Sequence, residues 1–268
     1  MKIKLLKFLL IAVVPVVFAA CERDDPETES ASLQASAESE SVMDEMDSEV
    51  LLRTTEVDYA ESTTGCPTVT YLNTAGTFPN TITIDWGTGC TGLDGRFREG
   101  AIVVDVTGPH FSAGSVRTMT SQGYAVDNWE VGGVRTVTNL GTTANDQMQW
   151  NIVENNASIT DPDGDVGTWT SDRTRTLVSG GNTVTLNDNS YEFTGTASGT
   201  NRQGGSYDSA IVIPLFKSFD CRWISSGSIE IEGRFNRTHT LDYGQGACDD
   251  QATLTFANGN SRSITLRR

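Results

Sequence analysis

Three aspartates at alternate positions could bind calcium. Asp161, Asp163 and Asp165 lie in an Asp-Pro-Asp-Gly-Asp stretch, and Asp172 occupies the twelfth position counted from Asp161. Carboxylates so spaced can converge on a hard cation, but the helix–loop–helix calcium loop needs Gly at its sixth position and Glu at its twelfth. The sixth position here is Val166. Because Pro-Asp-Gly is also an ordinary turn former, we predict a turn, with weak calcium binding as the alternative and no other cofactor.

Two further aspartates occur in a repeated motif. The segment DWGTGC at residues 85–90 resembles DYGQGAC at residues 242–248, with one residue inserted. Asp85 and Asp242 could act as the acid/base pair of a glycoside hydrolase. The repetition favours a structural role instead, in which the aromatic side chain is buried, the glycines turn the chain and the aspartate hydrogen-bonds the turn.

Histidine-dependent hydrolysis is poorly supported. The chain has two histidines, His110 and His239, and neither lies near a Gly-x-Ser-x-Gly motif. A catalytic serine needs a histidine that takes up a proton near neutral pH. We predict structural roles for both and name no catalytic residue.

Tryptophans provide a different kind of candidate site. Trp129 is flanked by polar residues just before a Gly-Gly pair, whereas Trp150 and Trp169 lie in polar stretches with alternating character. An exposed tryptophan beside carboxylates and amides can stack on a sugar ring. Core packing is the more common fate of each, so a glycan platform at these three residues is the sharper and less favoured hypothesis.

The cysteines predict two disulfides. Apart from Cys21 there are four, an even number that suits an exported domain. The repeated motif ends at Cys90 and Cys248, and each copy follows an earlier cysteine, Cys66 or Cys221, by 24 or 27 residues. We therefore predict the pairs Cys66–Cys90 and Cys221–Cys248. Zinc is the alternative, but no Cys-x-x-Cys pair is present.

The elements that must position these residues are strands. From residue 62 to 268 the sequence is rich in Thr and Gly and alternates between apolar and polar residues, which predicts one all-β domain containing two similar cysteine modules. Short connections favour an antiparallel meander folded as a twisted sandwich, with an open or closed barrel as the alternative. Asn258-Gly259 suits a two-residue hairpin turn. The predicted strands cover residues 67–72, 81–86, 101–107, 115–120, 133–140, 147–153, 166–178, 191–199, 207–213, 220–226, 228–232, 237–243, 252–256 and 261–267.

The N-terminus is typical of an export signal. Residues 1–20 contain three lysines, then an apolar run and two alanines directly before Cys21. The apolar run is shorter than the roughly 20 residues that span a bilayer. We predict a signal peptide that ends in a lipobox, so that Cys21 is lipidated and becomes the first mature residue. Ordinary cleavage, with Cys21 as an incidental thiol, is the alternative.

The residues after Cys21 are strongly acidic. Residues 22–61 carry 14 acidic and 2 basic residues, and the whole chain has a net charge of −16. With a single aromatic residue, residues 21–61 are predicted to form a lipidated cysteine followed by a disordered, self-repelling spacer. The sequence shows no basic cluster in linker or domain, so we expect no nucleic-acid partner and no electrostatic docking on anionic lipid.

Two sets of motifs carry a family resemblance. The run CERDDPE at residues 21–27 resembles the acidic segment of surface-exported lipoproteins of Bacteroidota. The two Asp-aromatic-Gly hairpins, GTASGTN at 195–201 and CRWISSG at 221–227 look like those of a group of Bacteroidota lipoproteins with no assigned function. The resemblance implies an all-β fold on the outer face of the outer membrane, and it implies no particular activity.

Together these features predict a non-enzymatic lipoprotein at the cell surface. It would bind a glycan or an envelope protein, or serve a structural role, with lipid as its only contact to the membrane. The alternative is a hydrolase that cleaves extracellular polysaccharide with paired carboxylates.

Overall fold

The computed structural model describes residues 26–54, 65–92, 94–181, 186–233 and 237–266. The predicted signal peptide, Cys21 and residues 22–25 and 55–61 of the predicted spacer lie outside these described residues.

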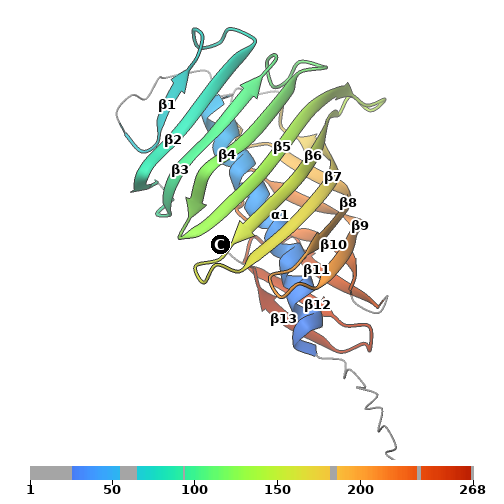
Figure 1. Ribbon diagram of the computed structural model, residues 1–268. Coiled ribbons are helices and arrows are strands. Elements are labelled where there is room, and N and C mark those ends of the chain that lie inside the picture. Colours follow the sequence, from blue (N-terminus) through green and yellow to red (C-terminus); the bar gives the residue numbers. More distant parts are fainter. Residues whose placement is uncertain (1–25, 55–64, 93, 182–185, 234–236, 267–268) are drawn as a thin grey trace, which may run out of the picture.

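Thirteen strands form one antiparallel sheet in which every strand pairs with its neighbour in the sequence (Figure 1). The predicted all-β antiparallel meander is therefore confirmed, and the sheet is not closed. Only the predicted run 220–226 is wrong, because residues 220–225 form the turn before β10. The strands are β1 (Thr68–Tyr71), β2 (Asn80–Thr91), β3 (Phe97–Val106), β4 (Val116–Val126), β5 (Trp129–Thr142), β6 (Met148–Thr160), β7 (Val166–Ser179), β8 (Ser190–Thr200), β9 (Ser206–Ser218), β10 (Ser226–Glu232), β11 (Thr238–Gln245), β12 (Gln251–Thr255) and β13 (Ser261–Thr265).

A long helix, α1 (Pro26–Thr54), runs along one face of the curved sheet (Figure 1). The prediction of a disordered spacer is wrong for these 29 residues. Small side chains let the helix approach the strands, since Ser32, Ser36 and Ser39 are buried. The Ser32 hydroxyl also accepts a hydrogen bond from Asn201 Nδ2 at 2.9 Å. We call the face of the sheet that α1 covers the inner face, and the opposite one the outer face.

Apolar side chains form two clusters beneath α1, one toward each end of the helix. Leu33 and Ala37 pack with side chains of β9 to β13. Met46 and Val50 pack with side chains of β1 to β8. Alternation along each strand supplies these inward residues, as in β2, where Ile82, Ile84 and Trp86 are buried. The helix thus contributes to both cores.

Bulges bend the sheet, and glycines make them possible. Gly195 of β8 has φ +125°, and a Cβ on it would lie 2.2 Å from the Asp172 carbonyl oxygen of β7. Gly133 of β5 has φ +106°, and a Cβ there would lie 2.5 Å from Ala157 Cα of β6. Only glycine tolerates both the close approach and the positive φ. The β5–β6 pairing shifts register beside Gly133, and the β8–β9 pairing shifts register beside Gly195.

Both predicted disulfides are confirmed: Cys66 is bonded to Cys90, and Cys221 to Cys248. The structural interpretation of the repeated motif is confirmed as well. Asp85 Oδ1 accepts a hydrogen bond from the Gly87 N–H at 2.7 Å, and Asp242 Oδ1 accepts one from the Gly244 N–H at 2.7 Å. Trp86 and Tyr243, which follow the aspartates, are both buried.

The hairpin between β12 and β13 differs slightly from the prediction. The Phe256 N–H donates to the Asn260 carbonyl at 2.8 Å, and the Gly259 N–H donates to the Phe256 carbonyl at 2.8 Å. The loop therefore has three residues, 257–259, rather than two. Gly259 takes the left-handed conformation, with φ +83°.

Candidate functional site

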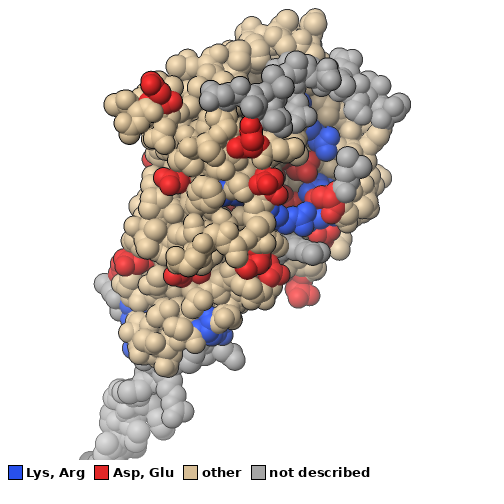
Figure 2. Space-filling view, turned by 180° about the vertical axis from the view of Figure 1, so that it is seen from behind, with Lys and Arg blue, Asp and Glu red and all other residues tan. Residues whose placement is uncertain are grey.

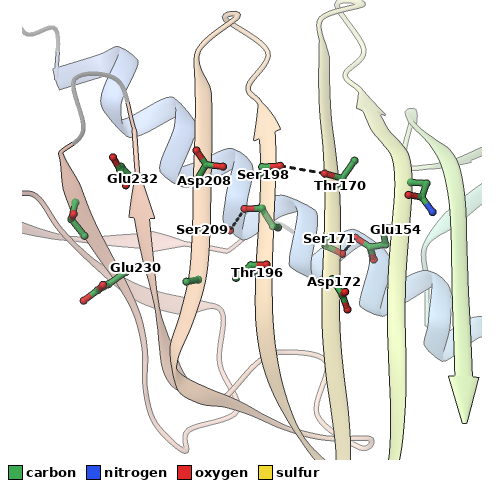
Figure 3. Close-up of a pocket in the computed structure, with 14 residues that line it drawn as sticks. Glu154, Thr170, Ser171, Asp172, Thr196, Ser198, Asp208, Ser209, Glu230 and Glu232 are labelled. Atoms are coloured by element: carbon green, nitrogen blue, oxygen red, sulfur yellow. Dashed lines mark hydrogen bonds between the residues drawn. The ribbon is translucent and has the colours of Figure 1, made fainter. Parts of the chain in front are cut away.

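A groove of about 570 Å³ lies on the outer face across β6 to β11 (Figure 3). Alternation along β7 fixes the face: Arg173 points inward and pairs with Glu40 of α1, so Thr170 and Asp172 point outward. We call this hollow the outer groove. It is lined by Glu154, Asn155, Thr170, Ser171, Asp172, Thr196, Ala197, Ser198, Asp208, Ser209, Ala210, Glu230, Glu232 and Thr238.

The outer groove coincides with irregularities in the strands. The β6–β7 ladder shifts register between Glu154 and Ala157, and the β8–β9 ladder shifts between Phe193 and Thr196. A bulge bends its strand and increases the local twist. The neighbouring strands therefore curve around a hollow.

The lining is dominated by hydroxyls and carboxylates. The Thr170 and Ser198 hydroxyls are 3.2 Å apart, and Asp172 Oδ1 accepts a hydrogen bond from Asn151 Nδ2 at 2.6 Å. Asp208, Glu230 and Glu232 add carboxylates from β9 and β10 (Figure 3). None of the described lining residues is Lys, Arg or aromatic. The site therefore favours ligands that donate hydrogen bonds or carry positive charge, and it disfavours anions.

Glu154 lies at the boundary between the outer groove and the interior. Its Oε2 accepts hydrogen bonds from Trp169 Nε1 and the Ser171 hydroxyl, both at 2.7 Å. Its other oxygen pairs with Arg135. Because both oxygens have inward partners, Glu154 fixes β6 against β5 and β7 and is poorly placed to exchange protons with a ligand.

The predicted glycan platform is wrong for Trp150 and Trp169, which are 0% and 4% exposed. Trp150 stacks on His110, with ring centroids 4.9 Å apart, and the Arg175 guanidinium lies 4.8 Å from its ring. Trp129 is half-buried at the start of β5, and the Arg202 guanidinium lies 4.9 Å from its ring centroid. Core packing, the favoured alternative, describes these residues.

The histidines are structural, as predicted. Burial, together with Arg117 and Arg175, holds the pKa of His110 well below its ordinary value, so this imidazole stays neutral. His239 is buried in β11, and its Nδ1 accepts a hydrogen bond from the Ala257 N–H at 3.3 Å. Neither contacts the outer groove.

The calcium alternative is not supported, and the predicted turn is present. Asp161 Oδ1 accepts hydrogen bonds from the N–H groups of Asp163 at 3.0 Å and Asp165 at 2.9 Å. Asp161 Oδ2 lies 3.4 Å from Arg202 Nε. Within the described ranges, no three His, Cys, Asp or Glu side chains are grouped so that they could hold a metal ion. This aspartate therefore organises the β6–β7 turn.

The expectation that the chain has no basic cluster is wrong, because the fold gathers arginines from separate strands. Each basic side chain of the set pairs with a carboxylate or is buried beneath α1, and Lys and Arg side chains that reach one flank in Figure 2 lie among Asp and Glu. Arg173 and Arg175 carry the signal that could have revealed this set, since residues two apart on a strand share a face. The set comprises Arg96, Arg98, Arg117, Arg135, Arg173, Arg175, Arg202 and Lys217.

Comparison with known proteins gives no family assignment. No protein-family model, no curated protein and no solved structure matches the chain. In the part of the chain that the structure describes, no helix is long and apolar enough to cross a membrane.

Proposed function

We propose that the chain is a lipoprotein of the bacterial outer membrane, anchored through Cys21, that binds a hydroxyl-rich extracellular ligand without converting it. The observation that carries the binding role is the outer groove, where hydroxyls and carboxylates converge on about 570 Å³ of open volume. The anchor rests on the signal, the lipobox and the acidic run after Cys21.

The side chains that line the outer groove limit the classes of ligand that it can bind. A carboxylate can accept hydrogen bonds from two hydroxyls of one sugar, and serine and threonine hydroxyls both donate and accept. Asp172, Asp208, Glu230 and Glu232 would repel sulfated or uronic-acid polymers. Neutral glycans and glycans with free amino groups therefore fit best. Stacking contributes little, because no described lining residue is aromatic.

A polysaccharide hydrolase is the second candidate, favoured by the same four carboxylates. The aspartates first considered for this role, Asp85 and Asp242, each hydrogen-bond a turn instead, and neither lines the outer groove. If the protein cleaves a neutral polysaccharide, and Asp208→Asn or Glu230→Gln abolishes the cleavage, the protein is a hydrolase.

The test is a glycan array and polysaccharide pull-down with the unlipidated chain, residues 22–268. The helix must be present, because fragment 62–268 would lack α1 and expose the inner-face arginines. We expect saturable binding to neutral or amino-sugar glycans, reduced at least tenfold in Asp208→Asn and Glu230→Gln. Glu192→Gln, which changes an exposed carboxylate of β8 outside the outer groove, is the matched control. A folded protein that binds no glycan would overturn the proposal.

A further inference from the structure

The inner face of the sheet concentrates buried positive charge from strands far apart in the sequence. Arg98, Arg135, Arg173 and Arg175 are all less than 6% exposed, and Lys217 is 7% exposed. A buried guanidinium without a partner is costly, so this surface requires an acidic occupant. In the structure the occupant is α1.

The carboxylates of α1 match this surface on two sides. Glu38, Glu45 and Glu49 are separated by seven and four residues, and Glu40, Asp44 and Asp47 by four and three. Such spacings place each trio on one side of a helix. The first and second trios start two residues apart, which turns them about 200° from each other at roughly 100° per residue. The helix therefore carries carboxylates on two opposite sides.

The ion pairs follow this division. The first trio pairs with basic residues of β3, of the residues just before it and of the β8–β9 turn. The second trio pairs with residues of β5, β7 and β9. The pairs are Glu38 with Arg202, Glu40 with Arg173, Asp44 with Lys217, Glu45 with Arg96 and Arg98, Asp47 with Arg135 and Arg175, and Glu49 with Arg98.

Apolar side chains of α1 contact the sheet in both halves of the helix, and Val42, near its middle, packs against the cluster that contains Met46 and Val50. Leu33 and Ala37 enter one cluster and Met46 and Val50 the other. The carboxylates alternate with these apolar residues along the helix, so the contact is both apolar and ionic, and the ionic part depends on the positions of the carboxylates. The ion pairs favour a helix with carboxylates at these positions, whereas an apolar surface alone would accept many amphipathic helices.

The position of α1 in the chain makes it an exchangeable element. It is the first described element, and only the chain between Thr54 and β1 joins it to the sheet. Every copy of the protein carries the same helix and the same inner face. Exchange of a terminal element between copies is a low-cost route to association, because the contacts within each pair are preserved.

We propose that the inner face is a second binding surface, selective for an acidic helix, and that the α1 helix of a second copy of this chain can occupy it. Two copies that exchange α1 form a dimer in which each helix–sheet contact is intermolecular. This inference does not depend on the outer groove or on its ligand.

A fluorescein-labelled peptide of residues 26–54 tests the surface, with the unlipidated chain, residues 22–268, as receptor. The chain's own helix competes at an effective concentration of roughly millimolar, so wild type should bind the peptide weakly. The variant Glu40→Gln/Asp44→Asn weakens the resident helix and leaves the inner face unchanged. We expect this variant to bind the peptide at least tenfold more tightly than wild type by fluorescence anisotropy, with affinity falling as salt rises.

The control variant Glu130→Gln/Glu192→Gln removes two exposed carboxylates of the sheet and should behave like wild type. Asp44→Asn alone serves if the double variant unfolds. Equal peptide affinity for all variants would overturn the proposal. So would equal binding of a scrambled peptide, because charge alone would then account for it.

The second-copy occupant is tested by sedimentation of wild-type chain. A pulse of urea at high salt releases the helix from the sheet, and return to buffer without urea at high protein concentration lets helices re-pair. We expect a dimer fraction that rises with the protein concentration during the return step. Wholly monomeric protein at about 0.5 mM would show that a second copy does not supply the helix.

Discussion

Asp47 illustrates how single carboxylates hold the molecule together. Its side chain is 3% exposed and lies between Arg175 and Arg135. Burial raises the pKa of Asp47, but Arg175, Arg135 and Arg117 outweigh burial and bring it below its ordinary value. A residue that is costly to bury alone is thus charged and compensated on several sides.

Replacing Asp47 with Asn should destabilise the protein by about 3 kcal/mol, because it leaves two buried guanidinium groups without their shared counter-ion. Urea unfolding at neutral pH, followed by tryptophan fluorescence, measures the loss. Glu192→Gln, on the exposed side of β8, should change the free energy of unfolding by no more than about 0.5 kcal/mol. Equal effects of the two substitutions would contradict a structural role for Asp47.

Acid should destabilise the fold over a defined pH range. Hydrogen bonds from Arg98 lower the pKa of Asp94 to about 2, whereas an unfolded chain titrates near 3.9. A carboxyl whose folded pKa is depressed stabilises the protein above the unfolded value and loses that contribution as the pH falls. We expect the free energy of unfolding to decline between about pH 4 and pH 2. Urea titrations across this range would test it, and Asp94→Asn should flatten part of the decline.

At the scale of elements, the features that depend on residues close together in the sequence were predicted correctly. Those that depend on contacts between residues far apart in the sequence were missed. Strands, turns and both disulfides follow from alternation, glycines and cysteine spacing within short segments. The helix does not. Glu45 reaches Arg98 across 53 residues and Asp44 reaches Lys217 across 173, so composition alone made α1 look like a solvated spacer. The outer groove was missed for the same reason, since its lining comes from six strands.

Glycine at position 195 should be essential to the junction of β7 and β8. Alanine there would place its Cβ 2.2 Å from the Asp172 carbonyl oxygen and 2.9 Å from Arg173 Cα, at φ +125°. We expect Gly195→Ala to cost about 3 kcal/mol through strain and overpacking. Gly204→Ala, at φ +79° with no atom within 4 Å, should cost about 1 kcal/mol. Thermal unfolding of both variants separates the cost of the steric clash at Gly195 from the cost of a positive φ alone at Gly204. Equal losses of stability would show that the close approach of β7 is unimportant at Gly195.

At the scale of the whole molecule, helix and sheet form one folding unit. The two apolar clusters both include α1 side chains, and the inner-face arginines depend on its carboxylates. The domain boundary predicted at residue 62 therefore cuts through a core. A sheet without α1 would expose both apolar surface and unpaired guanidinium groups.

Fragment 62–268 should consequently lack a cooperative unfolding transition, whereas fragment 26–268 should unfold in one step. Circular dichroism during heating makes the comparison, and the emission of the buried Trp150 and Trp169 reports packing. A sharp transition in the shorter fragment would mean that the sheet folds without its helix.

The position of α1 also sets how far the protein can stand from its anchor. Pro26, the first residue of α1, lies five positions after Cys21, and a fully extended chain over five positions spans at most about 18 Å. A free spacer from residue 21 to 61 would have reached about 140 Å on the same measure. With lipid on Cys21, the end of the sheet near β12 and β13, where α1 begins, would rest close to the bilayer (Figure 1). The protein would then sample polymers rooted in its own membrane and would not reach those of a distant surface.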